Sequence, residues 1–410
     1  MNQHRQSRLE VNKGVGMYVA IIGGKLQGTE AAYLAKKAGW RTLLIDTKKN
    51  TPASGLCDIT AQMDICHTEE ACDLLSEVDL IIPTLEDRES LSGLQKLADK
   101  IDLPVAFDFH SFALTASKSK SNELMENLGL SIPGSYPPCH FPIVVKPGDQ
   151  SGSRGLSIVT DEQDLCRKFN GDGIPDGWVA QKFIEGPSFS LEVIGVNGRY
   201  ITPQVTELHM DKTYDCKGVT APADISDELR NRFEELSIQL ADAVKLNGIM
   251  DVEVILHKEK LHVLEIDARL PSQTPIAVYW STGINMLEMV KNTISGSTTG
   301  DFLPAGSEKC VHLEHVRVAA DSITFAGEHL MTGCSPLTIV EDFFGATEAI
   351  TDYRPGSKNW AATLIHVGEN LQDLITQRKN TIENIRRQFD IQQLLVSNPE
   401  FIGDVHEVAA

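Results

Sequence analysis

The chain has 410 residues, of which 41% are hydrophobic, so it is long enough for about two or three domains with sizeable buried cores. It carries 37 Lys and Arg against 57 Asp and Glu, a formal net charge of -20 at pH 7. Nucleic acids and anionic membranes are bound by basic surfaces, so this balance argues against both as partners. It suits cationic ligands, or divalent metal ions that bridge protein carboxylates to phosphates.

The cysteine pattern and the apolar runs indicate a cytoplasmic protein. The eight cysteines are scattered and include no C-x-x-C pair, which predicts reduced thiols and no structural zinc site. No apolar run approaches the ~18 residues of a membrane span, and no signal peptide follows the start. Residues 1–16 are polar and aperiodic, and we interpret them as a tag or a disordered extension.

Residues 17–115 alternate short apolar runs with amphipathic stretches, which is typical of an N-terminal parallel α/β (Rossmann-like) domain with helices on both faces of its sheet. A glycine-containing turn at 23–28 separates the first strand from the first helix. We expect helices over 29–39 and 88–101, and strands over 18–22, 41–46, 79–83 and 104–107.

The rest of the chain divides into two α+β lobes, one over 116–188 and one over 189–410. In the first lobe we expect a helix over 121–129 capped by Ser121, an antiparallel hairpin around the Gly/Ser loop 148–155, and a strand over 178–186. In the second lobe we expect hairpins around Asn197-Gly198 and over 249–270, strands near 310–318 and 361–367, and helices over 227–246, 284–294 and 370–389.

The later hairpin of the last lobe is the first candidate for chemistry. Successive side chains of a strand point to opposite faces, so Asp251 and Glu253 share one face, and on the partner strand Glu265, Asp267 and Arg269 share one. Carboxylates on adjacent strands repel one another unless a cation holds them, and Mg²⁺ shared with phosphate oxygens fits that need. The alternative is a solvated sheet face on which Arg269 pairs with a neighbour.

A strand that ends at Lys146 and leads into the Gly/Ser loop is the second candidate. The lysine points a cation off the sheet, and the backbone N–H groups of the loop can surround phosphate oxygens. No Gly-Lys-Ser/Thr opens a helix here, which excludes a Walker A loop. Lys118, in the stretch SKSKSN, is a candidate for a second phosphate-binding cation. Taken alone, such a loop is a mobile turn and such a lysine is solvated.

Two further segments are candidates for ligand contacts. The turn 23–28, with Asp46 at the end of the second strand, suggests a dinucleotide site, but its spacing departs from G-x-G-x-x-G and so disfavours NAD. Farther along, His209, Asp211 and Asp215 lie beside an aromatic residue, which suits recognition of an ammonium group. As an isolated feature this second segment is an exposed loop.

Together these features resemble the ATP-grasp carboxylate–amine ligases. That family orders a parallel α/β domain, a small α+β lobe with lysines and a Gly-rich lid, and a lobe with magnesium-binding acids, and the order covers about 17–290 here. The most specific stretch is Glu265-Ile-Asp-Ala-Arg269, the family's acid-x-Asn/Asp-x-Arg strand. The stretches GGKLQGTEAAYLAKKAG, SLEVIG, TYDC, GIMDVE and EIDARLPSQTP resemble the members of the family that join 3-methyl-D-ornithine to the ε-amine of L-lysine.

The resemblance implies a role for each matching residue. ATP would be bound by two lysines, the lid and the hinge that meets adenine: Lys118, Lys146, Ser151, Gly152, Ser153, Gln181, Lys182, Phe183, Ile184 and Glu185. Mg²⁺ would be held by Glu253, Glu265 and Asp267, and Arg269 would be the catalytic residue that stabilises the transferring phosphoryl group. The substrates would be bound by Lys25, Leu26, Gln27, Asp46, Glu86, Ser190, Leu191, Glu192, His209, Asp211, Asp215 and Ser272. Pro187 and Ser188 occupy the place where many members carry a ribose-binding acid, so ribose would fall to Glu185 or another group.

The implied reaction forms an amide bond in two steps. The carboxylate of 3-methyl-D-ornithine, or of D-ornithine, attacks the γ-phosphate of ATP, and the ε-amine of L-lysine then displaces phosphate from the acyl phosphate. Neither step needs a protein nucleophile. The other hypotheses are a different amino-acid ligase of this fold, an NAD-dependent dehydrogenase and a non-catalytic binding module, and a homodimer is compatible with the sequence.

Overall fold

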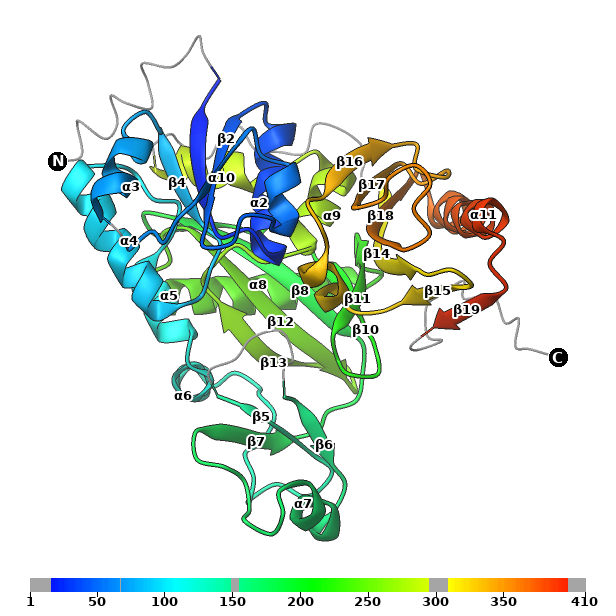
Figure 1. Ribbon diagram of the computed structural model, residues 1–410. Helices are drawn as coiled ribbons and strands as arrows, with labels where there is room; N and C mark the ends of the chain where they lie inside the picture. Colours follow the sequence, from blue (N-terminus) through cyan, green and yellow to red (C-terminus); the bar gives the residue numbers. More distant parts are fainter. Residues whose placement is uncertain (1–15, 67, 149–154, 295–308, 397–410) are drawn as a thin grey trace. The chain divides into compact units, whose positions relative to one another are not determined.

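The computed structural model describes residues 16–66, 68–148, 155–294 and 309–396, which form two compact units (Figure 1). Unit 1 contains the described residues of Met1–Phe107, Cys216–Pro222 and Leu270–Ala410, and unit 2 contains those of Asp108–Asp215 and Ala223–Arg269. Neither unit is a single stretch of sequence. Among the described helices, none has both the length and the apolar character that crossing a bilayer requires.

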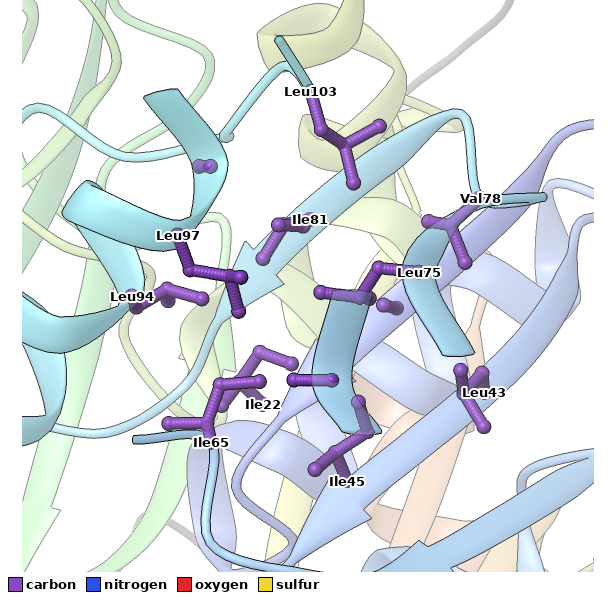
Figure 2. Close-up of a cluster of buried hydrophobic side chains, with 13 residues drawn as sticks. Ile22, Leu43, Ile45, Ile65, Leu75, Val78, Ile81, Leu94, Leu97 and Leu103 are labelled. Carbon is purple, nitrogen blue, oxygen red and sulfur yellow. The ribbon is translucent and has the colours of Figure 1, made fainter. Parts of the chain in front are cut away.

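The first sheet of unit 1 is parallel, with the strand order β3-β2-β1-β4. The strands β1, β2 and β4 are near-continuous apolar runs because both of their faces are buried, whereas the edge strand β3 is partly exposed. On one face Leu43, Ile45 and Ile81 pack with Leu75 and Leu94 of two helices (Figure 2). The elements are β1 (Tyr18–Ile22), α2 (Leu26–Lys37), β2 (Arg41–Asp46), η1 (Pro52–Gly55), β3 (Ile59–Gln62), α3 (Thr68–Leu75), β4 (Leu80–Pro83) and α4 (Arg88–Ile101).

Two sequence predictions for this part of the chain are wrong. The first helix begins at Leu26, so its first turn takes in residues that the sequence assigns to a glycine turn. Residues 104–107 do not form a strand, because Pro104 lacks the N–H that a ladder needs, and Val105 makes a single bridge to Ile81. The strand β3 and the helix α3 are not predicted from the sequence because both are short.

The second sheet of unit 1 is antiparallel in the order β11-β14-β18-β17-β16. In addition, β15 pairs with β14 in the antiparallel direction and with β19 in the parallel direction. The helix α11 packs on β14 and β18 through Ile382 and Ile385, which belong to the same apolar core. The elements are β11 (Cys216–Ala221), α9 (Thr274–Thr282), α10 (Met286–Ile294), β14 (Cys310–Val318), β15 (Ser322–Phe325), η3 (Glu328–Gly333), β16 (Thr338–Glu341), β17 (Glu348–Thr351), β18 (Trp360–Gly368), α11 (Leu371–Phe389) and β19 (Gln393–Val396).

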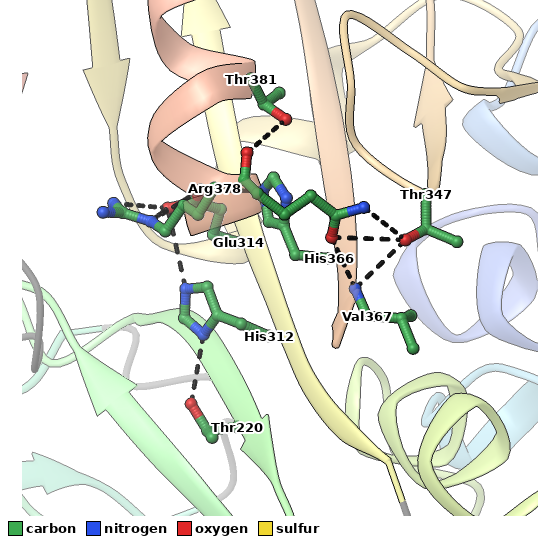
Figure 3. A network of polar contacts seen from close by, with 9 residues as sticks. Thr220, His312, Glu314, Thr347, His366, Val367, Arg378 and Thr381 are labelled. Atoms are coloured by element: carbon green, nitrogen blue, oxygen red, sulfur yellow. Dashed lines mark hydrogen bonds and ion pairs between the residues drawn. The ribbon is translucent and has the colours of Figure 1, made fainter. Parts of the chain in front are cut away.

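A buried polar network lies between β14, β18 and α11 (Figure 3). The guanidinium of Arg378 donates to both carboxylate oxygens of Glu314 at 2.8–3.0 Å. The Nε2 atoms of His312 and His366 lie 3.8 and 3.3 Å from the same carboxylate. Burial alone would raise the pKa of Glu314, but Arg378 and the imidazoles outweigh burial and hold that pKa well below its ordinary value. Burial lowers the pKa of His312, although Glu314 opposes the shift.

Unit 2 contains a three-stranded sheet in the order β6-β5-β7 and an antiparallel sheet in the order β13-β12-β8-β10, with β9 paired to β8. Four helices accompany these sheets in the described residues of the unit. The elements are α5 (Phe109–Thr115), α6 (Lys118–Asn127), β5 (Ile143–Pro147), β6 (Ser157–Val159), α7 (Glu162–Lys168), β7 (Trp178–Lys182), β8 (Ser188–Val196), β9 (Arg199–Ile201), β10 (Thr206–Met210), α8 (Asp227–Val244), β12 (Ile249–His257) and β13 (Lys260–Asp267).

The hairpins of unit 2 are confirmed. β5 and β6 are antiparallel neighbours around the Gly/Ser loop, and β8 and β9 join at Asn197-Gly198, both of which have positive φ. The turn between β12 and β13 is Lys258-Glu259, with φ of 49° and 65°. Ser226 caps α8 as expected, with its side chain accepting from Leu229 N.

Two helix ends in unit 2 differ from the prediction. Ser117, not Ser121, is the N-cap residue of α6, so Lys118 is the first residue of the helix and not part of a loop. Lys245 ends α8 in the left-handed conformation, two residues before the Asn247-Gly248 pair that the sequence favours. The strand β7 ends at Lys182, earlier than the sequence predicts, and its last two residues begin the segment called the hinge below.

Candidate active site

Five carboxylates occupy one face of the β13-β12-β8 sheet, and we call them the carboxylate face: Glu192, Asp251, Glu253, Glu265 and Asp267. Asp251 of β12 is paired with Glu192 of β8 on one side and with Asp267 of β13 on the other. Glu253 is paired with Ser190 and with Glu265 in the same way. Paired residues of antiparallel strands point to the same side. Glu192, Asp251 and Asp267 therefore form one row across the three strands, and Ser190, Glu253 and Glu265 form the row beside it.

The opposite face of the same strands is apolar. Leu191, Val252, Val254 and Ile266 are each at most 1% exposed. The alternation of acids and aliphatic residues therefore follows directly from the period of a strand with one face in the core. Leu191 is one of the predicted substrate residues, and its side chain lies on this apolar side, away from Ser190 and Glu192.

Three cations meet the carboxylate face. Lys118, at the start of α6, donates a hydrogen bond to the carboxylate of Glu265. The Nζ of Lys146, on β5, lies 3.9 Å from the other oxygen of Glu265. Arg269 Nη2 lies 3.0 Å from Asp267 Oδ2. The structure therefore brings together the two lysines and the acid that the sequence predicts for phosphate and metal.

Burial and mutual repulsion shift the pKa values of these groups. Burial lowers the pKa of Lys118, but Glu265 outweighs burial and leaves that pKa above its ordinary value. Burial leaves the pKa of Lys146 lowered despite Glu265. Burial would raise the pKa of Glu265, and the two lysines reverse that effect. Burial and then the neighbouring Asp251 and Glu265 raise the pKa of Glu253 to about 8.

The donor set of the carboxylate face fits a hard divalent cation. Its acids outnumber the three cations, and the raised pKa of Glu253 means that this buried carboxylate gains from a positive charge beside it. Glu253, Glu265 and Asp267 lie in adjacent positions of two paired strands. Within the described ranges, no three His, Cys, Asp or Glu side chains already converge as a metal site. Mg²⁺ commonly takes only one or two protein carboxylates together with phosphate oxygens of the substrate.

The hinge, residues 181–185, connects the small sheet to β8. Gln181 is 5% exposed, and its Nε2 has no hydrogen-bond partner among the described residues, so it is a buried donor that a bound ligand could satisfy. Lys182 Nζ donates to the carbonyl oxygens of His140 and Phe141 at 3.0 and 3.1 Å. Its ammonium group therefore supports the neighbouring loop.

The later part of the hinge packs closely on β12. The carbonyl oxygen of Glu185 forms a hydrogen bond with His257 at 2.8 Å. Gly186 lies so near the Leu256 carbonyl that a Cβ would meet its oxygen at 2.0 Å, so only glycine fits there. Phe183 makes an edge-to-face contact with Tyr214 at 6.1 Å between ring centroids. Ile184 lies between these contacts in the chain.

The predicted ammonium-binding loop is held by one of its own acids. Asp211 Oδ1 accepts hydrogen bonds from the backbone N–H and the hydroxyl of Thr213, and from the N–H of Asp215. Asp211 thus organises the loop, while His209 lies before it on β10. Tyr214 has a φ of 62° and contacts the hinge. The contact of Tyr214 with the hinge joins residues distant in sequence, so no local pattern predicts it.

Ser190 and Asp251 form a pair that sequence reasoning recognised only in part. The hydroxyl of Ser190 donates to Asp251 Oδ1. Period-2 alternation placed Asp251 on the carboxylate face, but the resemblance assigned it no role. Burial raises the pKa of Asp251, and the hydrogen bond from Ser190 opposes that shift. Asp251 is paired with Glu192 on one side and with Asp267 on the other, so it lies at the centre of the row that these three acids form.

The remaining predicted substrate residues lie in unit 1. Lys25 precedes α2 and is exposed, while Leu26 and Gln27 form its first turn. The amide Nε2 of Gln27 donates to Glu86 Oε1 at 2.7 Å, so the structure brings these two together. Asp46 uses both carboxylate oxygens to accept the backbone N–H groups of Gly24 and Lys48, each at 2.8 Å, and so supports the turn before α2.

The last of the predicted site residues are Ser272 and the three residues of the Gly/Ser loop. Ser272 follows β13 in the chain, and its carbonyl accepts from Thr274 N at 2.9 Å. The three lid residues, Ser151, Gly152 and Ser153, lie outside the described residues.

Comparison with known proteins gives close relatives over most of the chain. A 3-methyl-D-ornithine–L-lysine ligase of Methanosarcina mazei is 36% identical over 317 residues, which cover 77% of this chain and 82% of the relative. The enzyme of the same name from Methanosarcina acetivorans is 38% identical over 66% of this chain and 72% of its own. The ATP-grasp domain model matches residues 115–273. The chain belongs to the ATP-grasp ligases.

Solved structures agree on the ATP-grasp fold. An ADP complex of N5-carboxyaminoimidazole ribonucleotide synthetase superposes with a TM-score of 0.67 at 16% identity, and covers 91% of this chain and 98% of its own. An L-amino acid ligase from Bacillus licheniformis gives a TM-score of 0.61 at 18% identity, over 92% and 99%. The segment matched by the ATP-grasp model contains both lysines, the hinge and the whole carboxylate face. This chain is therefore an ATP-dependent ligase that forms C–N bonds.

Proposed function

We propose that the protein activates the carboxylate of 3-methyl-D-ornithine, or of D-ornithine, with Mg-ATP and couples it to the ε-amine of L-lysine, a step of pyrrolysine biosynthesis. The observation that carries the proposal is the 36% identity to a ligase named for these two substrates, over 317 residues that make up 77% of this chain. The relatives reported above are ligases and offer no support for an NAD-dependent dehydrogenase.

The first step needs charge neutralisation around the γ-phosphate. Lys118 and Lys146 would bind phosphate oxygens; their ammonium groups lie beside Glu265, which would share a cation with the phosphates, and this supports the assignment. Mg²⁺, when bound by Glu253, Glu265 and Asp267, would neutralise phosphate charge. Arg269, held by Asp267 at 3.0 Å, would stabilise the equatorial oxygens as the substrate carboxylate attacks and ADP leaves.

The second step needs an uncharged amine next to the activated carbonyl. The lysine ε-amine attacks the acyl phosphate, the C–O bond to phosphate breaks, and one proton leaves the nitrogen. Glu192 and Asp251 lie side by side on β8 and β12, and such carboxylates are suited to hold the ammonium groups of the substrates. No protein nucleophile is required.

Steady-state ADP release combined with product mass tests the proposal. The protein is assayed with Mg-ATP and L-lysine, alone and with D-ornithine or its 3-methyl derivative. We expect ADP only when both amino acids are present, with a product whose mass equals their sum minus one water. ADP formed with a different amino-acid pair would assign another ligase activity, and no ADP with any pair would contradict the proposal. We place this activity in the cytoplasm, in keeping with cysteines that are all free thiols.

A further inference from the structure

The turn that follows the metal-binding strand has an unusual backbone at Gln273. This residue has φ of 73° and ψ of -54°, and the N–H of Thr274 donates to the carbonyl of Ser272 at 2.9 Å. The three residues thus form a γ-turn with positive φ at a non-glycine centre, which is a rare and strained conformation. Glycine would take up this conformation without steric cost. The presence of glutamine, and not glycine, at such a position points to a function of its side chain.

The carboxylate of Glu30, on α2, holds this turn from the backbone side. Its two oxygens accept the N–H groups of Gln273 and Ile276 at 3.0 and 2.7 Å. Glu30 therefore caps the N-terminus of α9, which has no cap from its own N-cap side chain. Glu30 is 3% exposed, so its charge is committed to these N–H groups in the protein interior.

The side chain of Gln273 is held by a second pair of residues. Its Oε1 lies 2.9 Å from His315 Nε2 on β14, and the His315 Nδ1 lies 2.9 Å from the hydroxyl of Thr363 on β18. A neutral imidazole that donates from Nε2 and accepts at Nδ1 satisfies all three groups. Gln273, His315 and Thr363 are each at most 7% exposed. Both anchors of the turn thus come from rigid elements of unit 1.

These anchors join two segments that the proposed function assigns to substrate binding. Ser272 immediately precedes the strained residue. Glu30 lies one helical turn beyond Leu26 and Gln27 on α2, so its bonds to the turn tie Ser272 to the start of that helix. All of these residues belong to unit 1, whereas the predicted nucleotide-binding residues belong to unit 2.

We propose that Gln273 is a positioning residue for an amino-acid substrate: clamped between Glu30 and His315, its γ-turn fixes Ser272 relative to the first turn of α2. A cap for α9 alone would not need this strain, since Ser, Thr, Asp or Asn at position 273 would supply one in a relaxed conformation. The inference rests on the proposed ligase function, because it concerns how Ser272 meets the substrate.

Gln273→Gly is the decisive variant, because it tolerates the turn and removes only the side-chain anchor. We expect its KM for L-lysine, or for the ornithine substrate, to rise at least tenfold, with the KM for ATP within twofold of wild type. His315→Gln, which keeps a buried polar side chain but cannot bridge Gln273 and Thr363, should shift the same KM. The control is Asp390→Gly, the same kind of change at another positive-φ residue of unit 1, at the end of α11. It should leave every KM unchanged.

The outcomes separate this inference from the proposed function. Wild-type protein that releases no ADP with any amino-acid pair overturns both. Active wild type, with Gln273→Gly and His315→Gln within twofold for both amino acids, overturns the positioning role and leaves the ligase function in place. Equal increases in the KM for ATP and for the amino acids would indicate a general loss of structure and also overturn it. If Gln273→Gly does not fold, as judged by thermal unfolding, His315→Gln decides by the same criteria.

Discussion

Lys118, the first residue of α6, donates a hydrogen bond to the carboxylate of Glu265 on β13, 147 positions later in the chain. Lys146 approaches the other oxygen of the same carboxylate. One acid thus connects two cations from a helix and from the small sheet. A triphosphate with its metal would compete for all three groups, so these contacts should exchange when Mg-ATP binds.

Replacing Glu265 by Gln should reduce the turnover number for ADP release by roughly 10²–10³-fold, because the proposed metal ligand and the charge beside two lysines are both lost. ADP release at saturating Mg-ATP measures the effect. The control is Glu259→Gln, at an exposed position in the turn of the same hairpin. Turnover of Glu265→Gln within twofold of the control would show that this carboxylate holds no metal during catalysis.

Lys146→Met should raise the KM for ATP by about tenfold or more, the size expected for losing a charged hydrogen bond in a buried site. The aliphatic stem is retained, so the fold should be too. Lys120→Met, at an exposed position of α6, is the matched control. If the KM for ATP is unchanged while that for an amino acid rises, Lys146 binds substrate and the phosphate assignment is wrong.

Binding of Mg²⁺ should strengthen as the pH rises toward about 8. The pKa of Glu253 is raised from its ordinary 4.5 to about 8, so between these values the metal-free protein holds a proton there. The metal needs the ionised carboxylate and must expel that proton. Calorimetric titration with Mg²⁺ and ADP at pH 6, 7 and 8, in two buffers of different ionisation enthalpy, measures the proton release. Equal affinity at all three values would contradict this prediction.

Glu314→Gln should destabilise the protein by about 3–5 kcal/mol, the usual cost of removing one partner from a buried ion pair. Arg378 would lose the carboxylate to which its guanidinium donates at 2.8–3.0 Å. Glu383→Gln, which breaks only surface pairs with Arg386 and Arg387 on α11, should cost less than about 1 kcal/mol. Urea unfolding of both variants compares the two losses. Equal losses would mean that the network in Figure 3 adds little to stability.

Acid should destabilise the wild type through the same network. The pKa of His312 is lowered below its ordinary 6.5 and that of Glu314 lies well below 4.5, so the unfolded chain takes up protons first at both groups. The contribution of His312 to stability is complete above pH 6.5, and that of Glu314 above 4.5, and both are lost as the pH falls. Urea unfolding at pH 7, 6, 5 and 4 should show this fall. A Glu314→Gln variant with the same slope below pH 5 as wild type would contradict it.

Local patterns predicted much of this molecule. The β12–β13 hairpin, the cap at Ser226 and the long helix α11 follow from alternation, capping chemistry and helical period, which depend only on neighbours in sequence. The strand expected over 104–107 fails because Pro104 lacks an N–H. The helix α9 was not predicted because it is apolar on nearly all sides and shows no amphipathic period.

Long-range relations in the site could not be predicted by the same means. Alternation places Asp251 on the carboxylate face, but only the register of β8 with β12 shows that Ser190 donates to it. The clamp on Gln273 joins three elements that are distant in sequence, and no local signal marks a positive φ at glutamine. Lys182, assigned to ATP from the sequence, uses its ammonium group on two backbone carbonyls.

The strand β11 has a consequence for anyone who wishes to divide the protein. Unit 2 consists of two long stretches of the chain. The residues between them, Cys216–Pro222, belong to unit 1, where β11 pairs with β14. A fragment cut at 108 and 269 would contain this strand without β14, and the exposed edge of a strand invites aggregation. Exchanging unit 2 between related ligases therefore calls for joints at four places along the chain, including both ends of β11.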